Sequence, residues 1–268
     1  MTKDDVRRYL EFYQDLGVKN LYRRNATAPV VSAPPPAYAE SAAAATPGRA
    51  PQVASSTKPG ELSTPITALP LVPPMSPVHD TLAKISEDMG DCKRCRLHEG
   101  RNRIVFGSGN ELARLVFVGE GPGADEDEQG LPFVGRAGQL LTQMIEGTAR
   151  KEGIPLQRED VYICNVVKCR PPENRTPQPD EMEICGQFLF RQLQVIRPKA
   201  ICALGSTAAK ALLGTKDGVT RLRGKWHQWH DIPLMVTYHP SYLLRPYNQN
   251  AKKEAWDDLK KVLHYVYD

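Results

Sequence analysis

A carboxylate, an amide, a hydroxyl and an imidazole each stand at or near the end of a short apolar run. They are Glu120 after residues 115–119, Asn165 within 161–167, Ser206 after 200–205 and His239 at the end of 234–239. A lone histidine or buried asparagine is more often a structural group than a catalytic one. An acid and an imidazole that share one crevice are, however, groups that general acid–base catalysis uses. The joint occurrence of the four therefore predicts a polar, functional pocket.

The four apolar runs predict buried strands, and the segments between and after them have helical patterns. The expected helices cover 137–153, 179–196, 206–214 and 251–265. Strands that alternate with helices are joined by right-handed crossovers, which gives a parallel sheet covered on both faces. We therefore predict an α/β fold, a three-layer α/β/α arrangement around a central four-stranded parallel sheet. In such sheets ligands bind outside the carboxyl ends of the strands, where the four polar residues fall.

The first part of the chain differs sharply in composition from the rest. The pattern of residues 1–24 predicts a short amphipathic helix. Residues 25–79 are rich in Ala, Pro, Ser and Thr, a composition typical of a flexible, disordered linker. The globular domain is expected over 80–268. The terminal helix either packs on this domain or binds a protein partner from the end of its tether, and we favour the tethered arrangement.

Bulk composition sets few limits on function. The chain has 268 residues and a net charge of +4, which agrees with a polyanionic partner without requiring one. No apolar run has the length of a membrane span and no signal peptide is visible, so we expect a cytoplasmic protein without membrane contact.

Six cysteines in a reducing compartment are expected to be thiols or metal ligands rather than disulfides. Cys164 and Cys202 lie inside strand patterns, where cysteine acts as a small core residue. The other four lie in or beside loops or at a helix: Cys92, Cys95, Cys169 and Cys185. Four such thiolates fit a structural zinc ion or an iron–sulfur cluster, and the spacing does not separate the two. The alternative is one redox pair and two unrelated thiols.

The segment "GEGPGADEDEQGLPFVG" (119–135) combines glycines with an acidic run. Gly119, Gly121 and Ala124 match the spacing of a dinucleotide-binding loop. The carboxylates of 125–128 would stand where a pyrophosphate binds, and the next helix is expected only near Arg136. Both points argue against a dinucleotide. Taken alone, the acidic run is expected to be a solvated face.

The loop between Cys169 and Cys185 is stiffened by prolines and carries Arg170 and Arg175. A metal that ties both ends of this loop would hold the two arginines in place for contacts with phosphate groups. The alternative is an ordinary solvated loop.

Several motifs, taken together, resemble one enzyme family. "GEGPGADEDEQGLPFVGRAGQLL", "NVVKCRPPENRTP" and "HPSYLLR" occur in this order, with "CKRC" upstream. In this arrangement they closely resemble the family-4 uracil-DNA glycosylases, which are iron–sulfur members of the uracil-DNA glycosylase superfamily. The resemblance covers roughly residues 85–265. It implies a base excision repair enzyme that flips uracil out of DNA and hydrolyses its N-glycosidic bond, leaving an abasic site.

The resemblance also implies roles for individual residues. Phe133 would stack on the flipped base, and the Asn165 amide would read its Watson–Crick edge. His239 would donate a hydrogen bond to the uracil anion as it leaves. A carboxylate would orient the attacking water and stabilise the cationic sugar, and the resemblance leaves Glu120 and Glu126 as alternatives.

Other positions are expected to contact DNA or metal. Leu243 or Leu244 would fill the space that the flipped base leaves. Four polar residues of these motifs are expected near the DNA: Arg170, Arg175, Ser241 and Arg245. Ser206 would meet a phosphate at the N-terminus of its helix. The four loop cysteines would hold a 4Fe-4S cluster, whose expected role is structural because hydrolysis transfers no electrons.

In one place the sequence departs from better-known branches of the superfamily. Those carry Asp or Asn as the water-handling residue where this chain has Gly121, a position expected to line the uracil site. This is why the choice between Glu120 and Glu126 stays open. The 170–184 loop holds no histidine, so ordinary turnover is expected rather than a covalent bond to uracil.

Two other classes of function compete with the enzyme. One is a metal-stapled nucleic-acid-binding module without catalysis, which has no need to keep the acid, aromatic, amide and imidazole together. The other is the dinucleotide-binding protein. We expect the glycosylase, as a nucleoid-associated monomer that acts on uracil in single- or double-stranded DNA.

Overall fold

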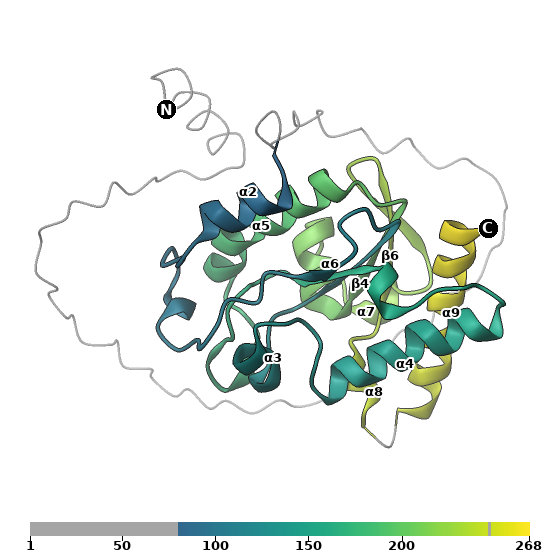
Figure 1. Ribbon diagram of the computed structural model, residues 1–268. Coiled ribbons are helices and arrows are strands. Elements are labelled where there is room, and N and C mark those ends of the chain that lie inside the picture. The colour runs from purple at the N-terminus through teal and green to yellow at the C-terminus, as the bar shows by residue number, and fades with distance from the viewer. Residues whose placement is uncertain (1–79, 246–247) are drawn as a thin grey trace, which may run out of the picture. The chain divides into compact units, whose positions relative to one another are not determined.

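The computed structural model describes residues 80–245 and 248–268. The helix expected over 1–24 and the linker expected over 25–79 lie outside the described residues, so both stay predictions. The described part of the chain forms a sheet with helices on both faces (Figure 1).

The sheet has six strands in the order β1-β3-β2-β4-β6-β5. Its central strands are parallel and correspond to the four predicted ones: β3 (Tyr162–Asn165), β2 (Leu115–Gly119), β4 (Ala200–Leu204) and β6 (Ile232–Thr237). The prediction of four strands is wrong at the edges, where β1 (Ser108–Gly109) and β5 (Trp226–Trp229) pair antiparallel to their neighbours. β1 is too short, and β5 too polar, to give the apolar run that marked the buried strands.

The helices form two layers, one on each face of the sheet. One layer consists of α2 (Leu82–Met89), α5 (Pro179–Ile196), α6 (Gly205–Leu213) and α7 (Val219–Leu222). The other consists of α4 (Arg136–Lys151), α8 (Pro240–Leu243) and α9 (Gln249–Tyr267). Short 3-10 helices lie in the connections: η1 (Arg96–His98), η2 (Arg158–Asp160) and η3 (Pro172–Asn174).

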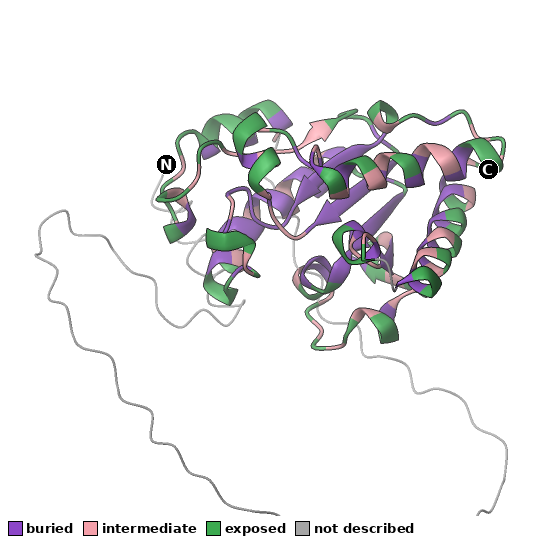
Figure 2. Cartoon of the chain, turned by 90° about the horizontal axis from the view of Figure 1, so that it is seen from below, coloured by how far each residue is buried: buried purple, intermediate pink, exposed green. Residues whose placement is uncertain are grey.

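Side chains alternate along the strands and so divide the core in two. Val116 and Val118 of β2 pack in the cluster under the first helical layer, and Leu115 and Phe117 pack under the second. Figure 2 shows the buried strands between helices whose outer sides are exposed. The predicted three-layer α/β/α fold is confirmed.

The helix boundaries follow from local sequence signals. α5 begins at Pro179, whose fixed φ suits the first turn of a helix, and the Glu181 carboxylate accepts a hydrogen bond from the Gln178 amide at 2.7 Å. α6 ends before Gly214, which has a φ of 62°. The predicted bounds of the four helices agree with the observed ones to within two residues.

The acidic run forms a helix of its own, so the expectation that the next helix begins only near Arg136 is wrong. The expected solvated face is confirmed only for the exposed Asp125 and Glu128. α3 (Ala124–Gln129) begins directly after the glycine loop and well before Arg136. Asp127 is fully buried rather than solvated, and its carboxylate accepts hydrogen bonds from the backbone and side-chain nitrogens of Asn102, at 2.9 and 2.8 Å. Carboxylates suit the first turn of a helix, because the backbone N–H groups there lack helical partners.

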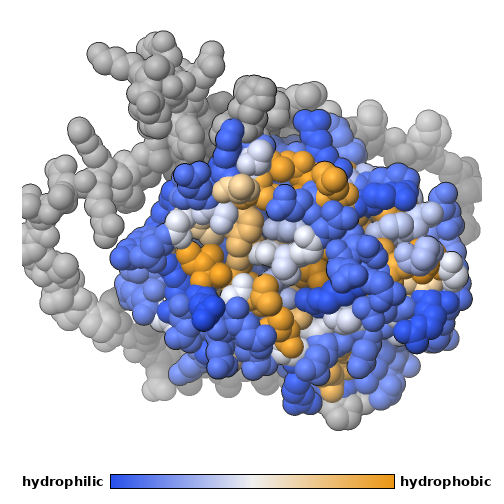
Figure 3. Space-filling model, in the orientation of Figure 1, coloured by the Kyte–Doolittle hydropathy of each residue, from blue (hydrophilic) through white to orange (hydrophobic). Residues whose placement is uncertain are grey.

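None of the described helices combines the length with the apolar composition that a membrane crossing requires. The face of the molecule seen in Figure 3 is mainly hydrophilic, and its apolar side chains gather in separate patches.

Candidate active site

The carboxyl ends of the four central strands meet at a cavity of about 330 Å³. The predicted site residues that line it are Glu120, Gly121, Glu126, Phe133, Asn165, Arg175, Ser206, His239 and Ser241. The predicted DNA contacts that do not line it are Arg170, Leu243, Leu244 and Arg245. The structure thus brings together the acid, amide, hydroxyl and imidazole that follow the four strands.

Asn165 ends β3 and is only 1% exposed. Its side-chain Oδ1 is buried and has no hydrogen-bond partner among the described residues. An unpaired buried acceptor costs about 1–3 kcal/mol, so its presence at the cavity wall indicates a place for a donor of a ligand. Gly119, the partner of Asn165 across the β2–β3 ladder, leaves room for this side chain, because a Cβ there would lie 2.4 Å from Oδ1.

Phe133 forms a second wall of the cavity. Its φ of 54° lies in the left-handed region, which is unfavourable for an aromatic residue. The ring centroid lies 5.6 Å from that of His239. Arg158 holds the turn by donating to the Pro132 carbonyl at 2.7 Å. The turn also lies close to α4, where a Cβ on Gly138 would be 1.9 Å from the Phe133 backbone oxygen, so only glycine fits there.

His239 lies just after β6 and makes its hydrogen bonds through one ring nitrogen. The Ser241 backbone N–H donates to Nδ1 at 3.2 Å, and the Ser241 Oγ is 2.8 Å from the same atom. Because a backbone N–H can only donate, Nδ1 is the acceptor, and the neutral ring carries its proton on Nε2. Nε2 makes no hydrogen bond to the described residues and is free to donate to a ligand.

The pKa of His239 is lowered to about 4, because burial disfavours the charged ring, although the carboxylate of Glu126 acts in the opposite direction. The imidazole is therefore neutral at pH 7. It can donate a hydrogen bond through Nε2 but does not bring a positive charge into the cavity.

The two candidate carboxylates have different surroundings. Glu126 Oε1 accepts hydrogen bonds from the backbone amides of 134–135, both at 2.9 Å, and its Oε2 accepts one from Gly123 at 3.0 Å. Glu120 accepts a hydrogen bond from the Thr207 hydroxyl through Oε2, and its Oε1 has no partner among the described residues. Glu126 therefore fixes the loop that carries Phe133, whereas Glu120 keeps the capacity to hold a water molecule.

Sequence reasoning did not identify four residues that shape this pocket: Gly119, Gly138, Arg158 and Thr207. Thr207 follows the predicted Ser206 in the first turn of α6, so the expected helix start could have indicated it. Gly119 was noted only for its place in the glycine loop. Gly138 and Arg158 act on the Phe133 turn from other elements, and nothing in their local sequence signals that contact.

The two loop arginines are held by neighbouring side chains. Arg175 forms two hydrogen bonds with the buried Glu181 carboxylate, at 2.9 and 2.7 Å, and the guanidinium lines the cavity. Arg170 Nε donates to Asn174 Oδ1 at 2.8 Å. Both cations are thus positioned by the loop before any ligand arrives.

The turn after His239 presents a tyrosine rather than a leucine. Leu243 is 1% exposed and belongs to the core under α4 and α9, and Leu244 is half-buried. Tyr242 is 40% exposed, and its ring stacks on Tyr238 with centroids 5.3 Å apart. The Arg245 guanidinium also lies over the Tyr242 ring, 5.9 Å from its centroid.

The four loop cysteines line one small cavity on the α2 and α5 side of the sheet, whereas Cys164 and Cys202 are core residues, as predicted. Arg101 donates to Cys169 Sγ at 3.2 Å, and the Lys168 backbone amide donates to Cys185 Sγ at 3.2 Å. Such donors stabilise thiolate ligands. No three His, Cys, Asp or Glu side chains of the described chain are arranged to hold a single metal ion. The four thiols and the donors around them agree with the predicted sulfur-ligated site.

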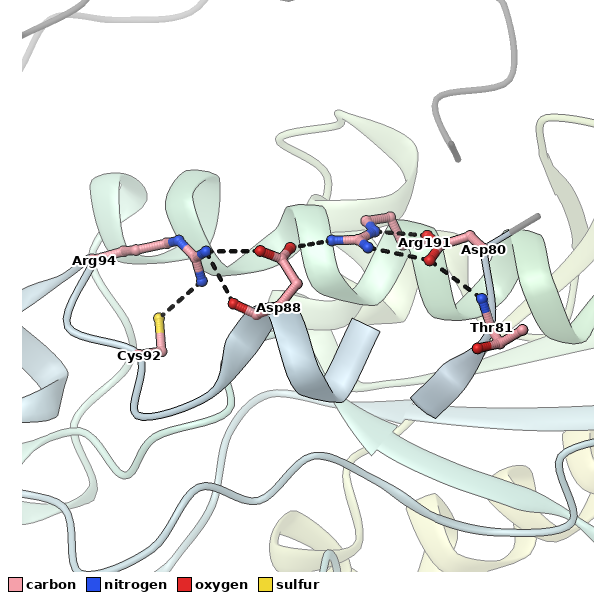
Figure 4. A network of polar contacts seen from close by, with 6 residues as sticks. All are labelled: Asp80, Thr81, Asp88, Cys92, Arg94 and Arg191. Carbon is pink, nitrogen blue, oxygen red and sulfur yellow. Dashed lines mark hydrogen bonds and ion pairs between the residues drawn. The ribbon is translucent and has the colours of Figure 1, made fainter. Parts of the chain in front are cut away.

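A polar network fixes the chain near Cys92 (Figure 4). Arg94 donates to Asp88 Oδ1 at 3.1 Å and lies 3.6 Å from Cys92 Sγ. Arg191 of α5 pairs with Asp88 and, at 2.8 Å, with Asp80. These contacts tie α2 to α5 and so hold the segment that carries the C-x-x-C pair.

Known proteins resemble this chain over the same region. The model of the uracil DNA glycosylase superfamily matches residues 106–260. A type-4 uracil-DNA glycosylase from Thermotoga maritima is 47% identical over 184 residues, which cover 68% of this chain and 93% of that protein. Type-4 uracil-DNA glycosylases from Sulfurisphaera tokodaii and Archaeoglobus fulgidus are 44% and 43% identical, with 84% and 92% of their lengths covered. This chain belongs to the uracil-DNA glycosylase superfamily and, within it, to the type-4 branch.

Proposed function

We infer that this protein excises uracil from DNA by hydrolysis of the N-glycosidic bond and so starts base excision repair. The observation that carries the inference is the cavity wall formed by Asn165, Phe133 and His239, which offers an unpaired acceptor, an aromatic ring and a neutral N–H donor. Family membership gives the reaction, and these three side chains give the chemistry that a flipped uracil needs.

Base recognition rests on Asn165 and Phe133. The unpaired Asn165 Oδ1 would accept the N3–H of uracil, and the amide nitrogen would donate to O4. Cytosine presents the opposite pattern at these two atoms, so the same amide would leave its own groups and those of cytosine unpaired. A site built in this way discriminates strongly, because unsatisfied buried polar groups are costly. Phe133 would stack on the face of the base.

Bond cleavage leaves a uracil anion, which His239 would stabilise. Nε2–H would donate to O2, where negative charge grows as the glycosidic bond breaks. Ser241 holds the ring in the required tautomer through Nδ1, so its role in this mechanism is to position His239.

Glu120 is the carboxylate that would orient the attacking water and stabilise the cationic sugar. Its support is the free Oε1 at the cavity, with Oε2 held by Thr207. Glu126 has both oxygens engaged by backbone amides and would keep the loop in place. Gly121, at the position of the water-handling Asp or Asn of other branches, lines the cavity without adding a side chain.

DNA would lie across the cavity mouth. Ser206 is exposed in the first turn of α6, where free backbone N–H groups favour a phosphate, and Arg170 and Arg175 stand on the neighbouring loop. Insertion of Leu243 would require it to leave the core, so we propose that Tyr242, stacked and exposed, meets the bases next to the flipped nucleotide, with Leu244 and Arg245 beside it.

The four loop cysteines would hold the 4Fe-4S cluster that the type-4 branch implies. When bound, the cluster supplies a covalent cross-link between segments 92–95, 169 and 185, and the hydrolysis needs no electron from it. We also propose that the enzyme is a monomer, that it works at the nucleoid on single- or double-stranded DNA, and that residues 1–24 bind a protein partner.

The test uses metal-replete protein and matched oligonucleotides that carry uracil, cytosine or thymine at one position, single- or double-stranded. Alkali should cleave only the uracil strand after incubation. Asn165→Asp should lower the uracil rate by about 100-fold or more, or admit cytosine, because the recognition pattern at the base edge changes. Absence of an abasic product with the parent protein would refute the function, and an unchanged Asn165→Asp rate and selectivity would refute the role of the amide.

A further inference from the structure

Lys168 is a fully buried lysine that the proposed mechanism does not use. It is 1% exposed, and no carboxylate of the described residues pairs with it. Its Nζ donates to the Asn165 carbonyl at 2.9 Å and to Gln192 Oε1 at 2.6 Å. Both acceptors are neutral oxygens, so the contacts define where the side chain points rather than neutralise a charge.

The segment 165–169 is a short stretch of chain that joins the two cavities. It begins at the base-reading Asn165 and ends at Cys169 of the cysteine cavity, which Lys168 also lines. At the cysteine end the Lys168 backbone amide donates to Cys185 Sγ at 3.2 Å, and its carbonyl accepts from Val105 at 2.8 Å.

The other end of the segment is bound to the loop that carries the catalytic acid. The Val166 amide donates to the Gly119 carbonyl at 3.0 Å, and the Val167 amide donates to the Glu120 carbonyl at 3.2 Å. These bonds continue the pairing of β2 and β3 beyond the last residues of both strands. The side chain of Lys168 then folds back over three residues and closes the segment on itself.

Gln192 of α5 fixes the far end of the lysine. Its Nε2 donates to the Phe106 carbonyl at 3.0 Å and to the Tyr162 hydroxyl at 3.2 Å, so Oε1 must face Lys168. Gln192 is itself fully buried. The lysine is therefore clamped between a helix of one layer and the end of β3.

We propose that Lys168 is a positioning residue that locks segment 165–169 into a rigid strut, so that the cysteine site sets the position of the base-reading amide of Asn165. This inference rests on the proposed uracil pocket. It gives the cysteine site a specific role, which is to fix the position of the Asn165 amide relative to Glu120.

The test is the Lys168→Met variant, which keeps an unbranched side chain, one heavy atom shorter, and removes the donors. Iron and sulfide content should match the parent, because no ligand is changed. The Kd for free uracil should rise about tenfold, and hydrogen exchange at the amides of Val166 and Val167 should accelerate by a similar factor. Affinity for uracil-free duplex DNA should stay within twofold. A folded variant with parental uracil affinity and exchange would overturn the proposal, and so would equal acceleration at all amides.

Two further variants keep the experiment decisive. Gln192→Leu removes the second acceptor of Lys168 and should raise the Kd for uracil about threefold. This variant tests the proposal if Lys168→Met does not fold. Tyr162→Phe removes a partner of Gln192 only and should leave uracil affinity at the parental value. If the parent neither binds nor excises uracil, the proposed function fails. If the parent binds uracil and Lys168→Met and Gln192→Leu bind it equally well, only the strut is refuted.

Discussion

Ser241 decides what His239 can do. A backbone N–H aimed at Nδ1 leaves the proton of the neutral ring on Nε2, and it would oppose an added proton on Nδ1. Burial acts in the same direction by lowering the pKa to about 4. Two independent features of the fold therefore keep the imidazole neutral while its donor faces the cavity. In the proposed mechanism, the leaving group would therefore be stabilised by the N–H dipole of the neutral ring, with no positive charge required.

This arrangement predicts the pH dependence of the contribution of His239. The ratio of single-turnover rates between the parent and His239→Ala should be about 100-fold or more and should stay constant from pH 8 to 5.5, because the ring does not titrate there. It should change only as the pH falls toward 4. A ratio that rises as the pH falls through 6.5 would show a charged imidazole and contradict this assignment.

The same pKa shift makes a statement about stability. The unfolded imidazole protonates near pH 6.5, whereas the folded one protonates near 4, so the unfolded state binds the additional proton between these values. The stability that depends on neutral His239 is therefore fully present above pH 6.5 and is lost as the pH falls through 4. His239→Ala should show a smaller fall in Tm over that window.

Glu120 and Glu126 can be separated by a matched pair of substitutions. Glu120→Gln should lower the excision rate by about 100-fold or more and leave Tm nearly unchanged, because its carboxylate accepts one hydrogen bond from a side chain. Glu126→Gln should lower Tm, since three backbone amides lose a charged acceptor. Excision rates on uracil-containing DNA and thermal melts of both variants test the assignment. If Glu126→Gln lost the rate and Glu120→Gln lowered Tm, the two roles would be exchanged.

At the scale of elements, the sequence predicted the parts of the site that depend on a strand end. A continuous apolar run followed by a polar residue indicates both a buried parallel strand and the crevice beyond it, as for Asn165 and His239. β5 and α3 were missed for a physical reason. β5 is an edge strand with two polar residues between two tryptophans, and α3 is capped by Glu126 and anchored by Asp127 through contacts with a distant loop. Such tertiary contacts produce no periodic pattern of apolar residues in the sequence.

α8 gives a second matched pair. Tyr242→Ala should slow excision from double-stranded DNA about tenfold more than from single-stranded DNA, because only a duplex needs its stack filled when a base leaves. Leu243→Ala should lower stability by about 2–5 kcal/mol without a preference for either substrate, since this side chain is in the core. Denaturant unfolding and rates on both substrates distinguish the two. If only Leu243→Ala slowed excision more on double-stranded than on single-stranded DNA, the inserted residue would be Leu243 and not Tyr242.

At the scale of the whole molecule, the cysteine cavity brings together side chains from segments that are far apart in sequence, and the proposed cluster would cross-link them. Cys185→Ser should abolish visible iron–sulfur absorbance and lower Tm by about 5 °C or more, because the proposed cluster would lose one of its four ligands. Cys202→Ala is the matched control, since this thiol is fully buried in β4 and outside the cavity. It should keep the parental iron content. A colourless parent that contains zinc would contradict the iron–sulfur assignment.

The unpaired oxygen of Asn165 has a consequence for any attempt to improve this protein by selection. Leu has the same heavy-atom branching as Asn and leaves no buried acceptor unsatisfied at this position beside the cavity, so Asn165→Leu should melt at a higher temperature than the parent and excise no uracil. A screen for thermostability alone would therefore enrich variants that have lost base recognition. The stability of the free enzyme and its selectivity draw on the same atom, and they have to be optimised together.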